Sequence, residues 1–181
     1  MRIVAGAWRG RALLSPQGRG TRPTADRVRQ ALFDMLLHAP WGGREVVEGA
    51  RVLDAFAGTG ALGLEALSRG AREARFIERD KTVLATLRAN IAACGAEARC
   101  RVLAADALAP PRGDPCALVF LDPPYGEQLV PRSLASLDAA GWISPGAIIV
   151  AECGRDEPPL DVATLAERSH GAARLEIWRH P

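Results

Sequence analysis

Residues Asp122-Pro123-Pro124-Tyr125 are the part of the sequence with the clearest chemical potential. They directly follow an apolar run, residues 116–121, whose lack of alternation predicts a buried central strand. In an open α/β sheet, the residues after such a strand lie at the edge where ligands bind. The tetrapeptide offers a carboxylate, backbone carbonyls in a stiff Pro-Pro corner and one aromatic ring. This set suits a planar group with an exocyclic NH2, because two acceptors can take its N–H bonds while the ring stacks on it.

A glycine pattern occupies the segment between the first predicted strand and the first predicted helix of the main repeat. Gly58, Gly60 and Gly63 spell G-x-G-x-x-G, and Glu78 follows Gly58 after 20 residues. In this strand-loop-helix position, the pattern matches the fingerprint of dinucleotide-binding folds. Other cofactors that contain a nucleoside use similar loops, so the glycines alone leave two interpretations open.

Acidic residues at the strand ends separate these interpretations. Asp54, at the tip of the first strand, would repel a pyrophosphate by about 1–4 kcal/mol at solvent-like dielectric. S-adenosylmethionine carries no phosphate but has a sulfonium, an α-ammonium and a ribose diol, which all favour nearby carboxylates. Asp54 matches its amino-acid part, Glu78 its ribose hydroxyls, and Asp106, next to Ala107, its adenine amine. We therefore expect S-adenosylmethionine as the cofactor.

Strand and helix patterns alternate from residue 51 onward, which predicts a parallel sheet with right-handed crossovers. A hairpin at the end of the chain would add an antiparallel edge. We expect an α/β, Rossmann-like fold with a seven-stranded, mostly parallel sheet. The expected strands are residues 52–56, 74–78, 101–104, 116–121 and 147–151, the hairpin strands are 162–168 and 172–178 around Ser169-His170-Gly171, and the expected helices are 61–69, 81–93 and 129–139.

Residues 1–40 precede this repeat and are predicted to be an extension of it. Their pattern predicts a short β-hairpin within residues 3–14 and a basic loop over residues 15–22. A helix is predicted to follow, with Thr24 as its N-cap and its end near Ala39-Pro40. So short a segment cannot fold alone, and we expect it to dock on the methyl-transfer unit predicted for residues 41–181.

Basic residues are concentrated in this extension. Residues 1–30 contain seven arginines and one acid, a net charge of +6, so the remainder of a chain with net charge +2 sums to −4. A basic arm on a slightly acidic body fits contact with the phosphate backbone of a nucleic acid. It also fits an ordinary solvated surface. Arginine supplies 22 of the 23 basic residues of the whole chain, so genome composition contributes to the number of arginines in this segment.

Composition excludes several other classes of protein. The 181 residues, 48% of them hydrophobic, predict one domain with a real core. The four cysteines and three histidines lack zinc-site spacing, so we expect no metal and a reducing compartment. No signal-peptide pattern and no membrane-length apolar stretch is present, so we expect a cytoplasmic, monomeric protein without membrane contact.

The tetrapeptide, the glycine loop and the strand-end acids together resemble class I methyltransferases that modify exocyclic amines. Asp-Pro-Pro-Tyr is shared with DNA adenine and cytosine amino-methylases, but the arginine-rich opening is similar to that of the RsmD family. The likeness runs from residue 2 to the terminal hairpin. The segments that carry it are Arg2-Ile3-Val4-Ala5-Gly6, Trp8-Arg9-Gly10-Arg11, residues 22–29 with Leu32-Phe33, residues 56–69 and Ile77-Glu78-Arg79-Asp80.

This resemblance implies transfer of a methyl group from S-adenosylmethionine to the N2 amine of a guanine in 16S (small-subunit) rRNA of bacteria. We expect catalytic roles for Asp122, Pro123 and Tyr125. The cofactor-binding residues expected are Asp54, Gly58, Gly60, Glu78, Arg79, Asp106 and Ala107, and the RNA-binding residues expected are Arg9, Arg11, Arg22, Arg27 and Arg29.

Other functions stay open from the sequence alone. An N6-adenine or N4-cytosine amino-methyltransferase of DNA or RNA would use the same tetrapeptide, although 181 residues hold no evident target-recognition domain for DNA. A nicotinamide-dependent oxidoreductase would use the glycine pattern. A catalytically silent RNA-binding assembly factor would need only the basic extension. The sequence also leaves open whether the substrate is free rRNA or a small-subunit assembly particle.

Overall fold

A computed structural model describes residues 1–15 and 23–181 of the chain. None of the helices in this part is long and apolar enough to cross a membrane. The helices are α1 (Pro23–His38), α2 (Ala61–Ser68), α3 (Lys81–Ala93) and α4 (Leu129–Ala139), with short 3-10 turns at Arg44–Val46 and Glu97–Arg99. The strands are β1 (Arg51–Asp54), β2 (Glu73–Glu78), β3 (Cys100–Ala104), β4 (Cys116–Leu121), β5 (Ile143–Gly154), β6 (Thr164–His170) and β7 (Ala173–Arg179).

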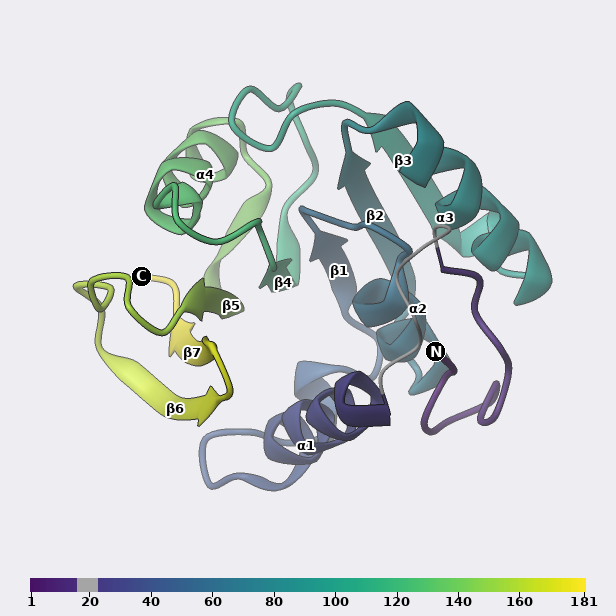
Figure 1. Ribbon diagram of the computed structural model, residues 1–181, viewed down its shortest axis with the longest axis horizontal. Coiled ribbons are helices and arrows are strands. Elements are labelled where there is room, and N and C mark those ends of the chain that lie inside the picture. The colour runs from purple at the N-terminus through teal and green to yellow at the C-terminus, as the bar shows by residue number, and fades with distance from the viewer. Residues whose placement is uncertain (16–22) are drawn as a thin grey trace.

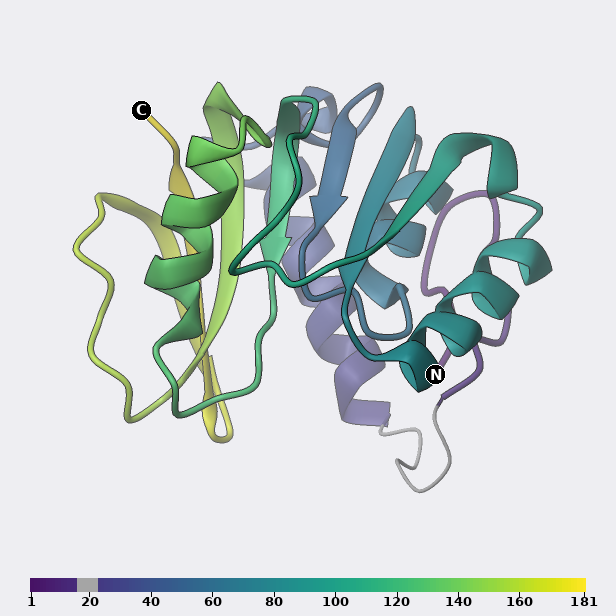
Figure 2. The ribbon, with the colours of Figure 1, turned by 90° about the horizontal axis from the view of Figure 1, so that it is seen from above.

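These strands form one sheet in the order β3-β2-β1-β4-β5-β7-β6. β1 to β5 run parallel, and β7 lies antiparallel between β5 and β6. α1, α2 and α3 pack on one face of the sheet and α4 packs on the other (Figures 1 and 2). The predicted α/β fold with an antiparallel terminal hairpin is confirmed. The strand order reverses between β1 and β4, which is where open α/β sheets bind ligands.

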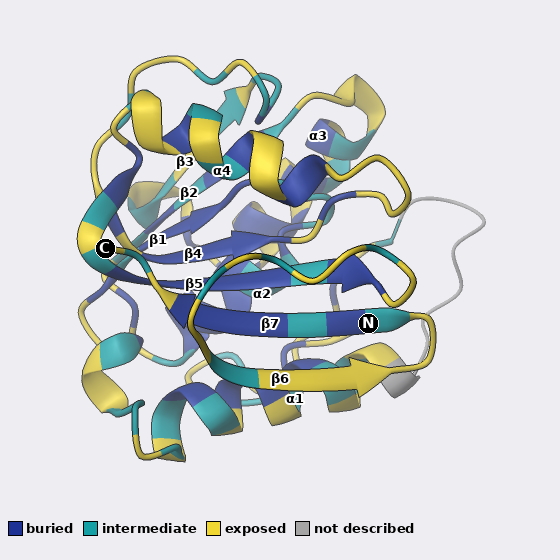
Figure 3. Cartoon of the chain, turned by 90° about the vertical axis from the view of Figure 1, so that its left-hand side faces the viewer, coloured by how far each residue is buried: buried dark blue, intermediate teal, exposed yellow. Residues whose placement is uncertain are grey.

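β4 lies at the centre of the sheet, as its unbroken apolar sequence predicts. Figure 3 shows β4 buried, whereas β6 forms an exposed edge. Side chains of β4 alternate between the two core clusters: Phe120 packs on the side of α1–α3, and Val119 and Leu121 pack on the side of α4. This alternation decides which strand-end side chains share a face.

Several element boundaries differ from the predictions by one or two residues, as at β1, which ends at Asp54 and not at residue 56. Three of the differences have a clear physical reason. α1 begins at Pro23, so Thr24 lies inside the first turn and is not the N-cap; proline is favourable at such a first position. β5 extends well beyond residues 147–151, because it pairs with β4 on one side and β7 on the other. The last turn lies at residues 171–172, where Gly171 adopts a φ of 58° that suits a two-residue hairpin turn.

The predicted N-terminal β-hairpin forms over a short stretch, with an antiparallel bridge between Arg2 and Ala12. The N–H of Ile3 donates to the carbonyl oxygen of Arg11 and the N–H of Gly10 to that of Ile3, both at 2.9 Å. The N–H groups of Val4 and Ala5 instead donate to the carboxylate of Glu65 on α2, at 2.9 and 3.0 Å. Backbone donors that a carboxylate satisfies do not need a partner strand. Most of the predicted basic loop, residues 16–22, lies outside the described residues.

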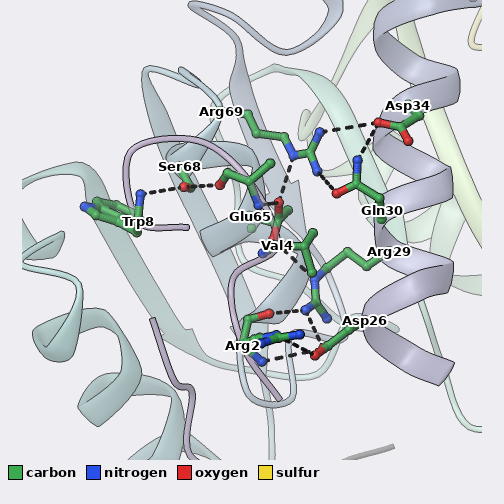
Figure 4. A network of polar contacts seen from close by, with 12 residues as sticks. Arg2, Val4, Trp8, Asp26, Arg29, Gln30, Asp34, Glu65, Ser68 and Arg69 are labelled. Carbon is green, nitrogen blue, oxygen red and sulfur yellow. Dashed lines mark hydrogen bonds and ion pairs between the residues drawn. The ribbon is translucent and has the colours of Figure 1, made fainter. Parts of the chain in front are cut away.

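Glu65 joins the extension to α1 as well as to α2 (Figure 4). Its side chain is fully buried, and it also accepts hydrogen bonds from Arg69 at 2.8 Å and from Arg29 of α1 at 3.4 Å. Two guanidinium groups and two backbone N–H groups thereby compensate a charge that would otherwise be costly to bury.

The extension also shares the hydrophobic core of the sheet. Ile3, Leu13 and Phe33 are at most 5% exposed, and they pack in one cluster with residues of β1, β2, β4 and α2. The ring centroid of Phe33 lies 5.8 Å from that of Phe120 in the central strand. The described part of the extension and the sheet therefore bury apolar surface in common.

Candidate functional site

The carboxyl ends of neighbouring strands bring together acids that are far apart in the sequence. Asp54 ends β1, Glu78 ends β2, and Asp122 directly follows β4. Asp54 pairs in register with Phe120, so Asp122 lies one side-chain repeat further along the same face. Leu121 pairs with Ala151, which brings Glu152 of β5 beside Asp122. The sheet thus places four carboxylates along one edge, on the face covered by α1–α3.

Asp54 is only 2% exposed and accepts a hydrogen bond from the N–H of Gly63 at 3.0 Å. Burial raises the pKa of Asp54 to about 8, although the Gly63 hydrogen bond opposes this shift. The negative charges of Asp122 and Glu78 raise the pKa further. The ionised form of Asp54 therefore lacks compensation, and a cation bound nearby would stabilise it.

Glu78 ties the glycine loop to the end of β2. Its Oε2 accepts the N–H of Gly58 at 3.0 Å, and its Oε1 accepts the N–H of Asp80 at 2.7 Å. Gly60 has a φ of 80°, and a Cβ there would lie 2.4 Å from Cδ1 of Leu87, so both its left-handed backbone and its packing against α3 favour glycine. A Cβ at Gly58 would meet only a backbone oxygen at 3.9 Å, so the space above Gly58 is open to a ligand.

Asp106 and Arg79 form an ion pair of 3.1 Å at the ends of β3 and β2. The pKa of Asp106 is lowered, mainly by a hydrogen bond from the N–H of Leu108 at 2.9 Å and also by Arg79. Ala107 is 3% exposed and packs in the core cluster on the side of α4. Arg79 thus lies near the expected adenine position, but its guanidinium group is already engaged by Asp106.

The tetrapeptide places its polar groups beside Glu152. The hydroxyl of Tyr125 donates a hydrogen bond to Oε1 of Glu152, and the tyrosine side chain remains 46% exposed. Asp122 keeps accessible surface, yet crowding by protein atoms and then the charge of Glu152 raise its pKa to about 7. Pro123 is buried behind it. A carboxylate and an exposed aromatic ring therefore flank the rigid corner, as the sequence predicts.

Glu152 is the residue of this site that the sequence analysis missed. The signal was present, because a single acid interrupts an otherwise apolar strand at its carboxyl end, after residues 147–151. Within the described part of the chain, no Arg, Lys or His forms an ion pair with any of the four strand-end acids Asp54, Glu78, Asp122 and Glu152. Nor do residues 1–15 and 23–181 contain a group of three or more His, Cys, Asp and Glu side chains arranged for a metal ion.

The arginines expected to contact RNA do not form one class. Arg9, Arg11 and Arg27 are exposed, and Arg11 donates to the carbonyl oxygen of Ala93. Arg22 lies outside the described residues. Arg29 is only 5% exposed, and its guanidinium group contacts Asp26 at 2.9 Å and Glu65 at 3.4 Å. Arg29 is therefore held inside the protein, and we assign it to the docking of the extension instead of to RNA.

This strand order, with β7 reversed beside β5 and an acidic edge at the switch point, defines the class I methyltransferase fold. A solved structure described as a putative methyltransferase yhhF from Escherichia coli superposes with a TM-score of 0.84, at 37% identity, over 99% of this chain and 97% of that one. A putative methylase from Haemophilus influenzae superposes with a TM-score of 0.79, at 32% identity, over 99% and 97% of the two chains.

Sequence comparison narrows the class to one family. The chain belongs to the family described as "Conserved hypothetical protein 95", whose profile matches residues 1–179. It is 36% identical to the ribosomal RNA small subunit methyltransferase D of H. influenzae, over 99% of this chain and 94% of that protein. The protein of the same description from E. coli K12 is 43% identical, over 84% and 74%. A putative rRNA methyltransferase, YlbH, from Bacillus subtilis is 32% identical, over 99% and 98%.

Proposed function

We propose that this protein transfers a methyl group from S-adenosylmethionine to the exocyclic N2 amine of one guanine in the 16S rRNA of the small ribosomal subunit. The observation that carries this proposal is the position of Asp122-Pro123-Pro124-Tyr125, at the end of the central strand and beside the acids of β1 and β2. Relatives described as ribosomal RNA small subunit methyltransferase D, matched over most of the chain, support the substrate class.

The cofactor side of the site fits S-adenosylmethionine by charge. Asp54 is a buried carboxylate whose raised pKa reflects an uncompensated charge, as expected for a residue that receives a cationic amino-acid group. Glu78 would accept from the ribose hydroxyls beside the open space above Gly58, and Asp106 from the adenine amine. When bound, this cofactor supplies an electrophilic methyl group on a sulfonium. A pyrophosphate would meet the same acids unfavourably, which argues against a nicotinamide cofactor.

Asp122 and Pro123 would hold the target amine. The lone pair of a guanine N2 is delocalised into the ring, which makes the amine a poor nucleophile. Two acceptors, the Asp122 carboxylate and the Pro123 carbonyl oxygen, would take both N–H bonds and direct the nitrogen lone pair out of the ring plane. The exposed ring of Tyr125 would stack on the base, a contact worth about 1–3 kcal/mol. The proton released after transfer would pass to Asp122 or to water.

The extension of residues 1–40 would supply the RNA contacts. Its exposed arginines Arg9, Arg11 and Arg27, together with Arg22, would contact phosphates. The target base must leave its helix to reach Asp122, so a looped or flipped nucleotide is expected. An extension this small fits a substrate that ribosomal proteins hold in shape, so we propose a small-subunit assembly particle as the substrate and a monomeric enzyme acting in the cytoplasm.

The direct test is to map methylated guanines of small-subunit rRNA in cells with and without this protein. One N2-methylguanine should disappear with the protein and return with the wild-type chain, but not with Asp122→Ala. An unchanged methylation map would contradict the proposal. A DNA amino-methylase, the second candidate that the tetrapeptide allows, predicts instead that purified protein methylates duplex DNA faster than rRNA or assembly particles.

A further inference from the structure

Glu152 has no role in the amine chemistry proposed above, yet it lies inside the site. The register of β4 with β5 brings it beside Asp122, on the same face of the sheet. One of its carboxylate oxygens, Oε1, accepts the hydroxyl of Tyr125. Among the described residues, its other oxygen has no hydrogen-bond partner, and no cation pairs with it. This second oxygen is not sealed from solvent, so it is free to accept a donor from the substrate.

We propose that Glu152 selects guanine, by accepting the N1–H of the base whose N2 amine Asp122 and Pro123 hold. This inference rests on the proposed function and names the specificity-determining residue of the same site.

The hydrogen-bonding edges of the bases support this assignment. In guanine, the exocyclic amine neighbours a ring N–H, so two donors lie side by side. In adenine and cytosine, the amine neighbours a ring nitrogen with a lone pair, which is an acceptor. An ionised carboxylate only accepts hydrogen bonds. Glu152 would therefore attract the ring edge of guanine and repel that of adenine or cytosine.

The geometry of the sheet supports it as well. Neighbouring strands lie about 4.8 Å apart, so acceptors at the ends of β4 and β5 can meet adjacent donors on one ring. Tyr125 is bound to Glu152 through its hydroxyl, so the stacking surface and the N1 acceptor are positioned together. The two other acids on this face, Asp54 and Glu78, already accept backbone N–H groups of α2 and the glycine loop, on the cofactor side of Asp122.

The test uses a base that separates the two contacts. 2-Aminopurine keeps the N2 amine of guanine but has a bare, accepting N1. The mapped target guanine is replaced by 2-aminopurine through ligation into the rRNA, and both RNAs are assembled with the same small-subunit proteins. Wild-type protein should methylate guanine roughly 10- to 100-fold faster than 2-aminopurine, the loss expected when a hydrogen bond to a charged group becomes a repulsion.

Glu152→Gln should reverse this preference or reduce it at least tenfold, because the glutamine amide can donate to the bare N1 while its oxygen still accepts from Tyr125. Tyr125→Phe is the comparison variant that keeps the carboxylate: it removes the hydroxyl that positions Glu152 but keeps the ring, so the ratio of the two rates should fall and still favour guanine. Calorimetry with S-adenosylmethionine verifies that each variant is folded and binds cofactor.

The outcomes separate the two proposals. If wild-type protein methylates guanine and 2-aminopurine equally, or if Glu152→Gln leaves the ratio of rates unchanged, the selection of guanine by Glu152 is refuted. Equal loss of both activities in Glu152→Gln refutes it too. If wild-type protein methylates neither base while it binds S-adenosylmethionine, the proposed function itself fails.

Discussion

Asn90 of α3 donates a hydrogen bond from its side-chain Nδ2 to the carbonyl oxygen of Thr59, at 2.9 Å, and thereby holds the glycine loop. The same amide bonds to both backbone groups of Leu14: the Leu14 N–H donates to Oδ1 at 2.7 Å, and Nδ2 donates to the Leu14 carbonyl at 3.1 Å. Asn90 is fully buried. One side chain therefore connects the basic extension to the loop that would contact the cofactor.

Asn90→Ala should lower both the stability of the folded protein and its affinity for the cofactor. Removing the amide takes three hydrogen bonds from partly buried backbone groups of Leu14 and Thr59, each worth about 0.5–1.5 kcal/mol. We expect the melting temperature to fall by at least about 4 °C and the affinity for S-adenosylmethionine to decrease. Thermal unfolding and calorimetry measure both. Arg88→Ala, a change at an exposed position of the same helix, is the control and should alter neither value.

Asp122→Ala should separate chemistry from cofactor binding. The substitution removes an acceptor for the target amine but leaves Asp54, Glu78 and the glycine loop intact. We expect the rate of methyl transfer to fall at least about a hundredfold, while the affinity for S-adenosylmethionine changes little. Single-turnover assays and calorimetry measure the two quantities. An equal loss of both would contradict the division of roles between β4 and the first two strands.

Asp54→Asn should make the ligand-free protein more stable at alkaline pH. The pKa of Asp54 is raised from its ordinary value of 3.8 to about 8, so the folded state holds the proton more tightly than the unfolded state does. Stability is then lost as the pH rises from about 4 to about 8. Asparagine can still accept from Gly63 without a charge. We expect a melting temperature at least about 2–4 °C above wild type at pH 8.5.

This gain should shrink toward zero near pH 4, where Asp54 is protonated in the folded state and about half protonated in the unfolded state. The same variant should bind S-adenosylmethionine more weakly. A stability gain that is independent of pH would show that burial of the Asp54 charge is not its cause.

Replacing Arg9, Arg22 and Arg27 together by Gln should weaken RNA binding and flatten its dependence on salt. Each lost phosphate contact reduces the slope of log affinity against log salt by about 0.7–0.9. Titrations at several salt concentrations measure this slope. Arg168→Gln, an exposed change on β6, is the control and should leave the slope unchanged.

Arg29→Ala should behave differently from the triple variant. It removes one of the cations that compensate the buried charge of Glu65, so its main effect should be a lower melting temperature.

The sequence predicted the parallel part of the fold well because each element there follows a local rule. β4 matches its apolar run in residues 116–121, and α3 begins after the N-cap Asp80, whose side chain accepts the N–H groups of Thr82 and Val83 at 2.7 and 3.2 Å. The arrangement of Asp54, Glu78 and Asp122 followed from a topological rule, since the carboxyl ends of parallel strands share one edge.

The failures all involve contacts with distant parts of the chain. Local pattern could not show that the N-terminal hairpin pairs only as far as Ile3, nor that Glu65, 60 residues from Ala5, takes the N–H group of Ala5. It could not distinguish Arg29, which is buried on a charge partner, from Arg27, which is exposed. Glu152 was missed because its importance comes from the register between β4 and β5, which single strands do not encode.

The position of Glu65 has a consequence for any attempt to trim this enzyme. Cutting away the first 40 residues would strip a completely enclosed anion of one guanidinium and of both amide donors, leaving Arg69 as its remaining counterion. Water or a proton would then have to enter the middle of α2, directly behind the glycine turn. The shortened polypeptide is therefore expected to bind both the methyl donor and RNA more weakly.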